Sequence, residues 1–338
     1  MSKYYIGIMT GTSADSLDAC LVSFENGFKF IHSKSNALPE RYKLDYEDSI
    51  DRGFKTTKES KKLKNIEDTL NKKTSQLVNR LLKDLNITKN EIKMIGFSGQ
   101  TVFHTNEKSY QIGNSQNIAN NTGINVMSDF RNYDIKNGGI GAPLIPAFHK
   151  YIYSEENKRK IIFNIGGIAN GTYLDGANIV LASDVGPGNC LMDQISLKQF
   201  NEMYDKNGAM AAKGIVLNNL LDYLLKKSPS EYPRADDKQD YYKLINEKFY
   251  NENTCDGLRT LAEFTAEKIK QFYVACDQPE EVIFHGGGTK NIFLMNLLSR
   301  KISKKIKTTD EKIPSKFVEA AAFAYLAYKK KGKIFISK

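Results

Sequence analysis

The chain has 338 residues, of which 41% are hydrophobic and 26% are charged, and its formal net charge at pH 7 is +10. This composition is typical of a globular protein with a sizeable core, and the length predicts about two domains of ~150 residues each. No stretch approaches the ~20 uninterrupted apolar residues of a membrane span, and the first residues run into a predicted strand instead of a signal peptide. We therefore expect a cytoplasmic protein with no membrane partner.

The patterns of charge and cysteine argue against two further classes of protein. Lysines are scattered among acids and asparagines rather than interleaved with aromatic residues in one stripe, so we expect no nucleic-acid partner. The cysteines Cys20, Cys190, Cys255 and Cys276 lie far apart, without a C-x-x-C pair. This spacing argues against a disulfide scaffold and a structural zinc site, and it predicts reduced, mostly packed thiols.

In the first part of the chain, strands alternate with helices. A β-branched and aromatic run predicts a strand over 4–9, and a strand over 17–24 follows the polar, glycine-containing loop 10–16. Apolar residues at helical spacing predict a helix that contains Leu63, Ile66, Leu70, Leu77 and Leu81. The next predicted elements are a buried strand over 92–97, a short helix over 115–121 and a strand over 124–128.

A similar plan recurs near residue 160. A strand over 160–165, the glycine loop 166–171 and two short strands over 172–174 and 179–182 repeat the first hairpin. After them we expect helices over 189–204 and 213–226, a loop over 228–240, a helix over 257–276, a strand over 281–284, and helices over 290–302 and 316–328.

This repetition predicts a mainly α/β fold made of two similar lobes with a cleft between them. Each lobe opens with a glycine-looped hairpin. We expect residues 1–128 and about 323–338 to form the first lobe, completed by a C-terminal helix that crosses back, and residues 129–322 to form the second.

Four polar glycine clusters occur where predicted strands end. They are Gly11-Thr-Ser-Ala-Asp15, Gly166-Gly-Ile-Ala-Asn170, Asp184-Val-Gly-Pro-Gly-Asn189 and Gly286-Gly-Gly-Thr-Lys-Asn291. Glycine lets backbone amides approach an anion closely, and hydroxyl groups add donors, so together the clusters favour a nucleotide clamped between the lobes. Neither a P-loop nor a G-x-G-x-x-G dinucleotide fingerprint is present.

Two short sequence motifs suggest an esterase as an alternative to a nucleotide-binding protein. His285-Gly-Gly-Gly288 copies an oxyanion-hole loop, and Gly96-Phe-Ser98-Gly-Gln100 nearly copies a nucleophile elbow. Gln100, however, occupies the second glycine of the elbow, and the His-Gly-Gly-Gly segment follows the candidate serine instead of preceding it. We therefore set this interpretation aside.

The ordered motifs of the chain resemble those of the anhydro-N-acetylmuramic acid kinases nearly from end to end. They are Met9-Thr-Gly-Thr-Ser-Ala-Asp-Ser-Leu-Asp18, Gly99-Gln-Thr-Val-Phe-His104, Gln111-Ile-Gly113, Ser128-Asp-Phe-Arg131, Gly138-Gly-Ile-Gly-Ala-Pro-Leu-Ile-Pro-Ala-Phe-His149, Asn164-Ile-Gly-Gly-Ile-Ala-Asn170, Asp184-Val-Gly-Pro-Gly-Asn-Cys-Leu-Met-Asp193 and Gly286-Gly-Gly-Thr-Lys-Asn291.

The resemblance implies an actin-like, sugar-kinase-like ATPase fold. It also implies an ATP- and Mg²⁺-dependent kinase that opens a 1,6-anhydro sugar with water and phosphorylates O6, giving N-acetylmuramic acid 6-phosphate for cell-wall recycling. The implied partners are the amino sugar, ATP and a second copy of the chain in a homodimer. No dedicated metal site in the protein is expected, since Mg²⁺ would enter with ATP.

The resemblance also assigns site residues. The ATP-binding residues would be Gly11, Thr12, Ser13, Ala14, Asp15, Ser16, Leu17, Asp18, Gly166, Gly167, Gly286, Gly287, Gly288 and Asn291. Asp184 matches the catalytic base, which would take a proton from the attacking water, and Glu319 would help to order that water or the carboxylates around it.

The candidate substrate-binding residues are Gln100, Asp129, Arg131 and Asp193. Arg131 would suit the lactyl carboxylate of the sugar or would pair with Asp129. Asp193 is either a substrate contact or an ordinary helix residue. Asp15 and Asp18 either satisfy turn amides or face phosphate and magnesium. His104 and His149 fit structural histidines better than general bases.

Three departures from the family pattern stand out. Ser16 replaces a glycine of the phosphate loop, Val185 replaces a threonine beside the base, and Tyr232-Pro-Arg-Ala-Asp-Asp-Lys-Gln-Asp240 replaces a proline-proline-lysine-serine-threonine-glycine-arginine-glutamate segment. We expect the last change to bear on sugar specificity and to leave the base and the ATP loops alone. These departures also keep a second hypothesis open, a non-catalytic sugar or nucleotide sensor on the same fold.

Overall fold

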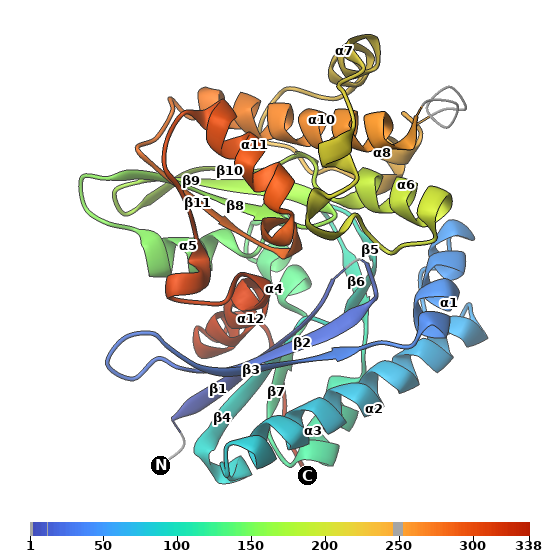
Figure 1. Cartoon of the computed structure of the whole chain (residues 1–338). Helices are drawn as coiled ribbons and strands as arrows, with labels where there is room; N and C mark the ends of the chain where they lie inside the picture. The colour runs from blue at the N-terminus through green and yellow to red at the C-terminus, as the bar shows by residue number, and fades with distance from the viewer. Residues whose placement is uncertain (1–2, 12, 246–252) are drawn as a thin grey trace. The chain divides into compact units, whose positions relative to one another are not determined.

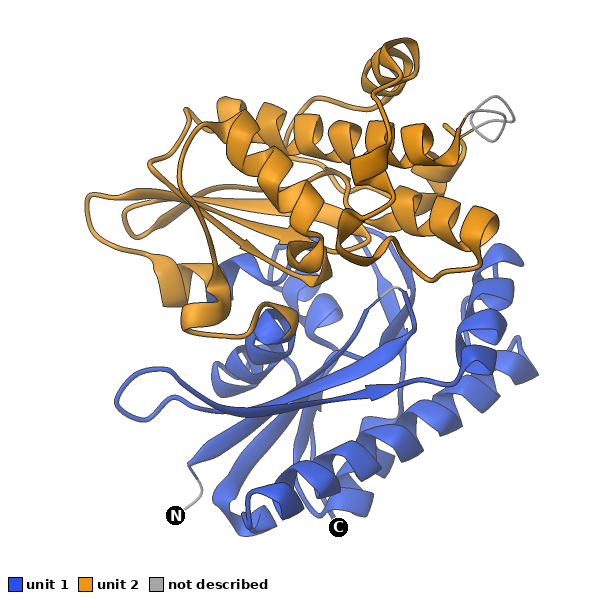
Figure 2. Cartoon of the chain, in the orientation of Figure 1, with its two compact units in different colours: residues 1–148, 317–338 blue, residues 149–316 orange. Residues whose placement is uncertain are grey.

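A computed structural model describes residues 3–11, 13–245 and 253–338. The chain divides into two compact units, the first made of residues Met1–Phe148 and Phe317–Lys338 and the second of His149–Lys316 (Figure 2). The chain thus leaves the first unit after Phe148 and returns to it at Phe317. The division falls near 148 and 316, whereas the sequence placed the boundaries at about 128 and 323.

The first unit is built on a six-stranded sheet (Figure 1). Its strands lie in the order β13-β7-β4-β1-β2-β3. Their bounds are β1 Tyr4–Thr10, β2 Ser16–Ser23, β3 Lys29–Ala37, β4 Ile92–Phe97, β7 Val126–Ser128 and β13 Lys333–Phe335, and a separate hairpin joins β5 Gln100–His104 to β6 Ser109–Ile112. The helices of this unit are α1 Glu40–Asp51, α2 Lys61–Asp84, α3 Ser115–Thr122, α4 Phe130–Lys136 and α12 Val318–Tyr328.

The second unit is built on a five-stranded sheet in the order β10-β9-β8-β11-β12. Its strands are β8 Arg159–Ile165, β9 Ile168–Asp175, β10 Asn178–Pro187, β11 Glu281–His285 and β12 Ile306–Thr308. Its helices are α6 Cys190–Phe200, α7 Asn218–Lys227, α8 Lys238–Tyr242, α10 Thr254–Ala275 and α11 Ile292–Ile302, and α5 Pro146–Tyr153 spans the division between the units.

The two sheets share one topology, which confirms the predicted duplication of shape. In each, three consecutive strands form an antiparallel meander, β1-β2-β3 in the first unit and β8-β9-β10 in the second. The first strand of each meander then pairs in parallel with a later strand, β4 or β11, which pairs in parallel with β7 or β12. A glycine-containing loop joins the first two strands of each meander.

In the first unit, the alternation of side chains along β1 explains how helices cover both faces of the sheet. Ile6 and Ile8 are fully buried in one apolar cluster with the α2 residues Leu63 and Leu70. Gly7 between them faces the opposite side and packs against α12. Because successive residues of a strand point to opposite faces, the pattern Ile-Gly-Ile fixes which helix covers which face.

Helix α2 forms where the apolar periodicity predicts it. Its N-cap Ser60 accepts a hydrogen bond from the Leu63 backbone N–H at 3.3 Å, and Leu77 and Leu81 are also fully buried. The side-chain acceptor satisfies one of the amides that the first turn of a helix leaves without a partner.

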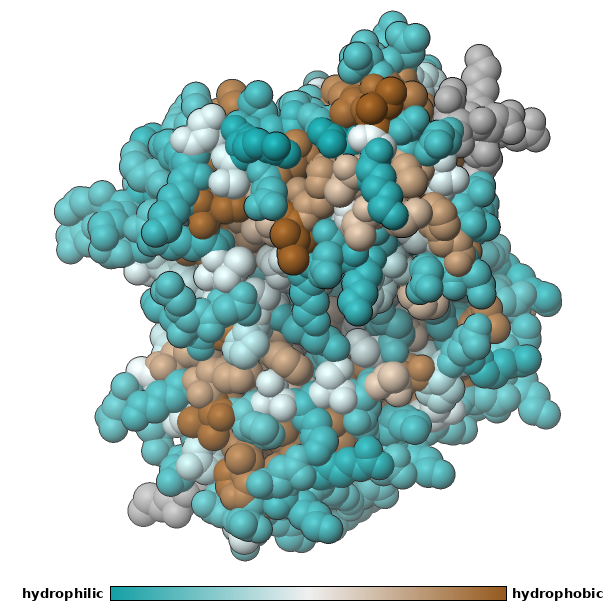
Figure 3. Space-filling view, viewed as in Figure 1, coloured by the Kyte–Doolittle hydropathy of each residue, from teal (hydrophilic) through white to brown (hydrophobic). Residues whose placement is uncertain are grey.

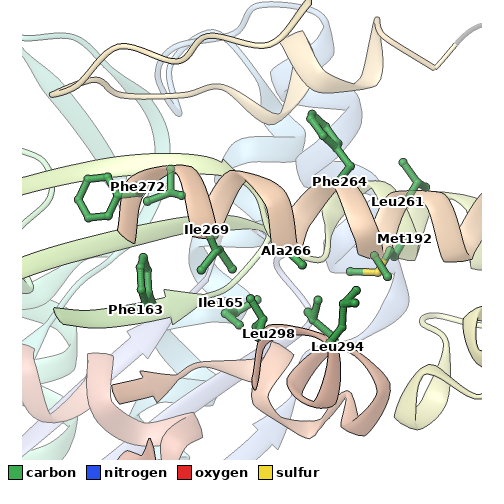
Figure 4. Packing of buried hydrophobic residues seen from close by; sticks show 14 of the residues in the cluster. Phe163, Ile165, Met192, Leu261, Phe264, Ala266, Ile269, Phe272, Leu294 and Leu298 are labelled. Atoms are coloured by element: carbon green, nitrogen blue, oxygen red, sulfur yellow. The ribbon is translucent and has the colours of Figure 1, made fainter. Parts of the chain in front are cut away.

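In the second unit, helix α10 provides much of the core. Figure 4 shows Ile269 and Phe272 of α10 near Phe163 and Ile165 of β8, and all four are fully buried. Phe163 and Phe272 meet edge to face, with ring centroids 5.9 Å apart. This packing anchors β8, whose carboxyl end carries a glycine turn.

Several elements differ from those that the sequence predicts. Strand β3, helix α1 and the β5-β6 hairpin were not predicted, and the helix expected over 213–226 begins only at Asn218. Among the described residues, no helix has the length and apolarity needed to cross a bilayer. Figure 3 shows a largely hydrophilic face on which apolar residues gather in small, separate groups.

Candidate active site

The loop between β1 and β2 is a compact turn. The Ala14 N–H donates to the Gly11 carbonyl at 3.1 Å, and Ser13 Oγ donates to the Asp15 carboxylate at 2.9 Å. Ala14 has a left-handed backbone with φ of 52° and is fully buried, which holds the turn on the core. Thr12 lies outside the described residues.

The next positions of this predicted phosphate loop belong to β2. Ser16 pairs with Ala37 of β3 and is not among the residues with a positive φ, so no glycine is needed there. Leu17 is fully buried in the core under α2. Nothing in the backbone at Ser16 therefore requires a glycine.

Gln100, at the start of β5, hydrogen bonds to the residues at the beginning of this loop. Its Oε1 accepts a hydrogen bond from Thr10 Oγ1 at 2.8 Å, and its Nε2 donates to the Gly11 carbonyl at 3.0 Å. The side chain is fully buried. In this structure, both ends of the Gln100 amide thus hold the predicted phosphate loop.

Two carboxylates and a guanidinium come together in the first unit. Glu319 lies in the first turn of α12, Asp18 on β2 and Arg131 on α4. Burial and the negative charge of Asp18 raise the pKa of Glu319 to about 7, and the positive charge of Arg131 opposes that rise. A carboxyl group with a pKa near neutrality can exchange a proton at physiological pH, which is typical of functional sites.

Asp129 and Arg131 lie at the beginning of α4. Asp129 has a left-handed backbone with φ of 58°, and its Oδ1 accepts a hydrogen bond from Asn132 Nδ2 at 2.6 Å. Arg131 Nη1 donates to the Gly141 carbonyl at 3.0 Å, which ties the glycine-rich segment after α4 to this helix. Both predicted substrate residues are therefore held by hydrogen bonds within the first unit, and the charge of Arg131 acts on Glu319.

In the second unit, two glycine turns follow neighbouring parallel strands. Gly166 and Gly167 follow β8, and Gly286 follows β11, whose residue His285 is paired with Asn164. Because parallel strands end at the same edge of a sheet, the two turns lie together. Gly286 has φ of 92°, and a Cβ there would lie 2.3 Å from the Asn164 side chain.

The segment that follows Asp184 completes this cluster of turns. The Asn189 N–H donates to the Gly166 carbonyl at 2.8 Å, and the Gly188 N–H donates to the Gly167 carbonyl at 2.9 Å. A Cβ on Gly188 would lie only 2.2 Å from the Gly166 oxygen, so this approach requires glycine. Hydrogen bonds between backbone groups thus join the glycine turn after β8 to the segment that follows Asp184.

The remaining predicted nucleotide residues of this unit differ in their surroundings. A Cβ on the exposed Gly287 would meet no atom of the described residues within 4 Å, whereas a Cβ on Gly288 would lie 2.2 Å from Ile165. Asn291 is the N-cap of α11, and its Oδ1 accepts the Leu294 N–H at 3.0 Å. Its side chain therefore has a structural role in this structure.

Asp184 lies on β10 beside an irregularity in the strand. It pairs with Asn170, while Gly186 pairs with Ala169, so Val185 is an extra residue in the ladder. Such a β-bulge bends the strand and re-aims the neighbouring side chains. The Asp184 Oδ2 accepts the backbone N–H of Asp236 at 2.9 Å, and the Asp184 N–H donates to the Arg234 carbonyl at 3.0 Å.

This contact corrects one expectation from the sequence. The altered segment 232–240 was expected to leave the base alone, but residues 234 and 236 hydrogen bond to Asp184 itself. Sequence reasoning missed both as functional candidates. The available signal was their position in the one long segment that departs from the family pattern.

Two further expectations concern polar residues of the second unit. Asp193 is partly exposed in the first turn of α6, where a negative charge suits the positive end of the helix dipole. His149 and His285 are fully buried, with their Nε2 atoms 2.9 Å apart, and His149 Nδ1 lies 2.9 Å from Thr172 Oγ1. The structural role predicted for His149 is confirmed, and His285 is equally enclosed.

Comparison with known proteins gives one consistent family. The family model described as anhydro-N-acetylmuramic acid kinase matches residues 3–334. A protein of that name from Shewanella amazonensis is 37% identical, with 96% of this chain and 90% of the relative covered. The protein of that name from Haemophilus influenzae is 35% identical, with 96% of this chain and 91% of the relative covered. The one from Neisseria meningitidis is 34% identical, with 96% of this chain and 92% of the relative covered.

Two solved structures share the fold at 12% sequence identity. One is the activator of the 2-hydroxyisocaproyl-CoA dehydratase from Clostridium difficile with bound ADPNP, with a TM-score of 0.53 over 97% of this chain and 95% of the other. The second is (R)-2-hydroxyglutaryl-CoA dehydratase component A from Acidaminococcus fermentans, with a TM-score of 0.53 over 98% of this chain and 100% of the other. The predicted actin-like, sugar-kinase-like ATPase fold is confirmed.

Proposed function

The chain belongs to the anhydro-N-acetylmuramic acid kinase family, and from this premise we propose that it opens the 1,6-anhydro ring of anhydro-N-acetylmuramic acid with water and phosphorylates O6 with ATP. The product is N-acetylmuramic acid 6-phosphate, an intermediate suited to the recycling of cell-wall sugar. Membership makes the protein a kinase. The observation that carries the finer proposal is the fixed position of the Asp184 carboxylate beside a β-bulge and a glycine turn.

In the proposed reaction, Asp184 accepts a proton from a water molecule as the water oxygen attacks the anomeric carbon. A bond forms between that oxygen and the anomeric carbon, and the bond from the anomeric carbon to O6 breaks. O6 then attacks the γ-phosphorus of ATP, the bond to the β-phosphate bridging oxygen breaks, and ADP leaves. The proton taken from water ends on the carboxylate and returns to solvent.

The glycine turns supply the proposed contacts to ATP. The β1-β2 loop would present backbone amides to phosphate, and the turns at Gly166-Gly167 and Gly286-Gly288 would bind the rest of the nucleotide. Open space beside Gly287 leaves room for a phosphate to approach the backbone, because no atom of the described residues lies within 4 Å of where a Cβ would be. Among the described residues, a Cβ on Gly11 would meet Ser13 alone, at 3.6 Å or beyond.

Magnesium would enter with ATP. Burial and the negative charge of Asp18 raise the pKa of Glu319, so the two carboxylates interact, and their oxygens are the donors that would hold such a cation. Oxygen ligands of this kind suit Mg²⁺, which would neutralise phosphate charge when bound. Arg131, in the same group, would bind the carboxylate of the sugar's lactyl substituent.

The decisive experiment combines turnover with an isotope label. Purified protein is incubated with ATP, Mg²⁺ and anhydro-N-acetylmuramic acid in ¹⁸O-labelled water, and the product is analysed by mass spectrometry. We expect one label at the anomeric hydroxyl and none in the phosphoryl group. Tight binding of both substrates without turnover would instead support the sensor hypothesis.

We also propose that the protein acts in the cytoplasm as a homodimer, as the family resemblance implies. Light scattering after size-exclusion chromatography tests the pairing, for which a single peak at the monomer mass would be the contrary result. Salt-dependent binding of DNA or RNA, which we do not expect, is checked with the same sample.

A further inference from the structure

Residues 234 and 236 hydrogen bond to β10 at the proposed base and its neighbours. Strand β10 lies at the edge of its sheet, paired on one side with β9. On its other side, the Asp184 N–H donates to the Arg234 carbonyl at 3.0 Å, and the Arg234 N–H donates to Ser183 Oγ at 2.9 Å. The segment thus provides backbone partners for an edge that would otherwise be open.

The guanidinium of Arg234 donates hydrogen bonds to other groups of the protein. Nη2 donates to the carbonyl of Val185, the extra residue of the bulge, and Nη1 donates to the Glu231 carbonyl at 3.0 Å. Nε donates to Asp236 Oδ1 at 2.8 Å, and the guanidinium carbon lies 4.7 Å from the centre of the Tyr232 ring. A bulge leaves its extra residue outside the ladder, and here Arg234 provides the partner for the carbonyl of that residue.

Asp236 is held at both carboxylate oxygens. Arg234 bonds Oδ1, and the Tyr241 hydroxyl donates to Oδ2 at 2.6 Å. The side chains of Arg234 and Asp236 are only 11% and 4% exposed, so this ion pair is largely shielded from water. Separating the two side chains would leave a buried charge without a partner, which costs free energy. The folded protein therefore keeps Arg234 and Asp236 in contact.

These contacts end on the carboxylate of Asp184. The backbone N–H of Asp236 donates to Asp184 Oδ2 at 2.9 Å, and the same residue's side chain is fixed by Arg234 and Tyr241. Movement of Asp236 would therefore shift the donor that orients the proposed base. A displacement of about 1 Å at a reacting group can lower a rate by about a hundredfold.

We infer that Arg234 and Asp236 are positioning residues for Asp184, and that the altered segment acts on the proposed base and not on the choice of sugar. This inference rests on the proposed function of Asp184. It means that the guanidinium of Arg234 binds the β-bulge at Val185 and the carboxylate of Asp236, and not the carboxylate of a substrate. Tyr241 contributes to the same positioning, because its hydroxyl group donates a hydrogen bond to Asp236.

The main test compares Asp236→Asn and Arg234→Lys with Asp240→Asn as the control. Asp240 forms an exposed ion pair with Lys243 in the same part of the chain. For the first two variants we expect kcat to fall about 10- to 100-fold, with the KM values for ATP and sugar within about twofold of wild type. The control variant keeps the wild-type kcat.

A double-mutant cycle separates positioning from a loss of folded protein. In an Asp184→Asn background, Asp236→Asn should cause no further loss of residual turnover, because the group that it positions is gone. Equal losses in both backgrounds would mean a structural role only. A higher KM for sugar with an unchanged kcat would mean a specificity role, and either result overturns the inference.

Tyr241→Phe keeps the test decisive if the charged variants do not fold. It removes one hydroxyl and should lower kcat about 3- to 10-fold without changing either KM, consistent with the ~0.5–1.5 kcal/mol of one hydrogen bond. An unchanged kcat in a folded Tyr241→Phe protein would count against the inference. Wild-type turnover in Asp184→Asn alone would instead remove the proposed base.

Discussion

Gly7 of β1 and Ala320 of α12 approach so closely that a Cβ on Gly7 would lie 1.8 Å from the Ala320 carbonyl oxygen. Gly96 of β4 makes a similar approach, 2.1 Å from the Phe323 carbonyl oxygen. Helix α12 therefore sits in a groove formed by two glycines on neighbouring strands. The first turn of α12 carries Glu319, so this groove also fixes the position of a proposed catalytic residue.

The first prediction concerns this groove. Gly7→Ala should destabilise the first unit by several kcal/mol, because the added methyl group meets backbone that cannot rotate away, and overpacking alone costs about 1–3 kcal/mol. Thermal unfolding measures the change. Gly287→Ala is the matched control for stability, since its Cβ would enter open space. Equal melting temperatures for the two variants would contradict the packing described here.

The second prediction follows from the raised pKa of Glu319, which is about 7 against the ordinary value of 4.5 for a glutamate side chain. The folded state holds this proton more tightly than the unfolded state, so stability is fully present below pH 4.5 and declines as the pH rises to 7. Glu319→Gln removes the ionisation. It should exceed the wild type in stability by roughly 1–3 kcal/mol at pH 8 and by little at pH 4.5.

Unfolding at those two pH values checks the Glu319 prediction. Glu311→Gln, at an exposed position, serves as the control for the substitution itself. A Glu319→Gln protein that is less stable than wild type at pH 8 would show that the carboxylate is stabilised in the fold rather than strained by its surroundings. Turnover should fall in the same variant, because the proposed function uses the carboxylate.

The third prediction concerns Gln100. In Gln100→Leu, the Thr10 hydroxyl and the Gly11 carbonyl lose their buried partner, at about 1–3 kcal/mol for each unsatisfied group. The β1-β2 loop would then be less ordered before ATP binds. We expect the KM for ATP to rise on the order of tenfold, the equivalent of about 1.4 kcal/mol, with a smaller change in the KM for sugar. The opposite split would identify Gln100 as a sugar contact.

The fourth prediction concerns the proposed base. Asp184→Asn keeps the size of the side chain and removes its ability to accept a proton, so turnover should fall about 10²- to 10⁴-fold. Isothermal titration with ATP should give nearly the wild-type affinity, since the glycine turns are unchanged. A variant with wild-type turnover would exclude Asp184 as the base.

Much of the sheet could be predicted because the relevant strands are buried and end at glycines. The meander β8-β9-β10 reads clearly as Ile- and Val-containing runs separated by Gly166-Gly167 and Gly176. Strand β3 could not be read in this way. It lies at the edge of its sheet and carries His32, Lys34 and Asn36, so its letters lack the apolar alternation of a half-buried strand.

The site was predictable only in part, for a related reason. Motif resemblance found Asp184 and Glu319 separately, and the structure places Glu319 beside Asp18 and Arg131. The bond from Asp236 to Asp184 joins residues 52 positions apart through a segment without regular structure before α8. Periodicity carries information on helices and strands, and it does not say where an irregular segment makes its hydrogen bonds.

The return of the chain to its first unit affects the order in which the protein is made. On a ribosome, residues 317–338 emerge only after all of the second unit. Until then the N-terminal sheet lacks the helix that fills the groove over Gly7 and Gly96. A nascent chain at that stage exposes the face of the sheet that α12 later covers, and transiently exposed apolar surface of this kind favours aggregation.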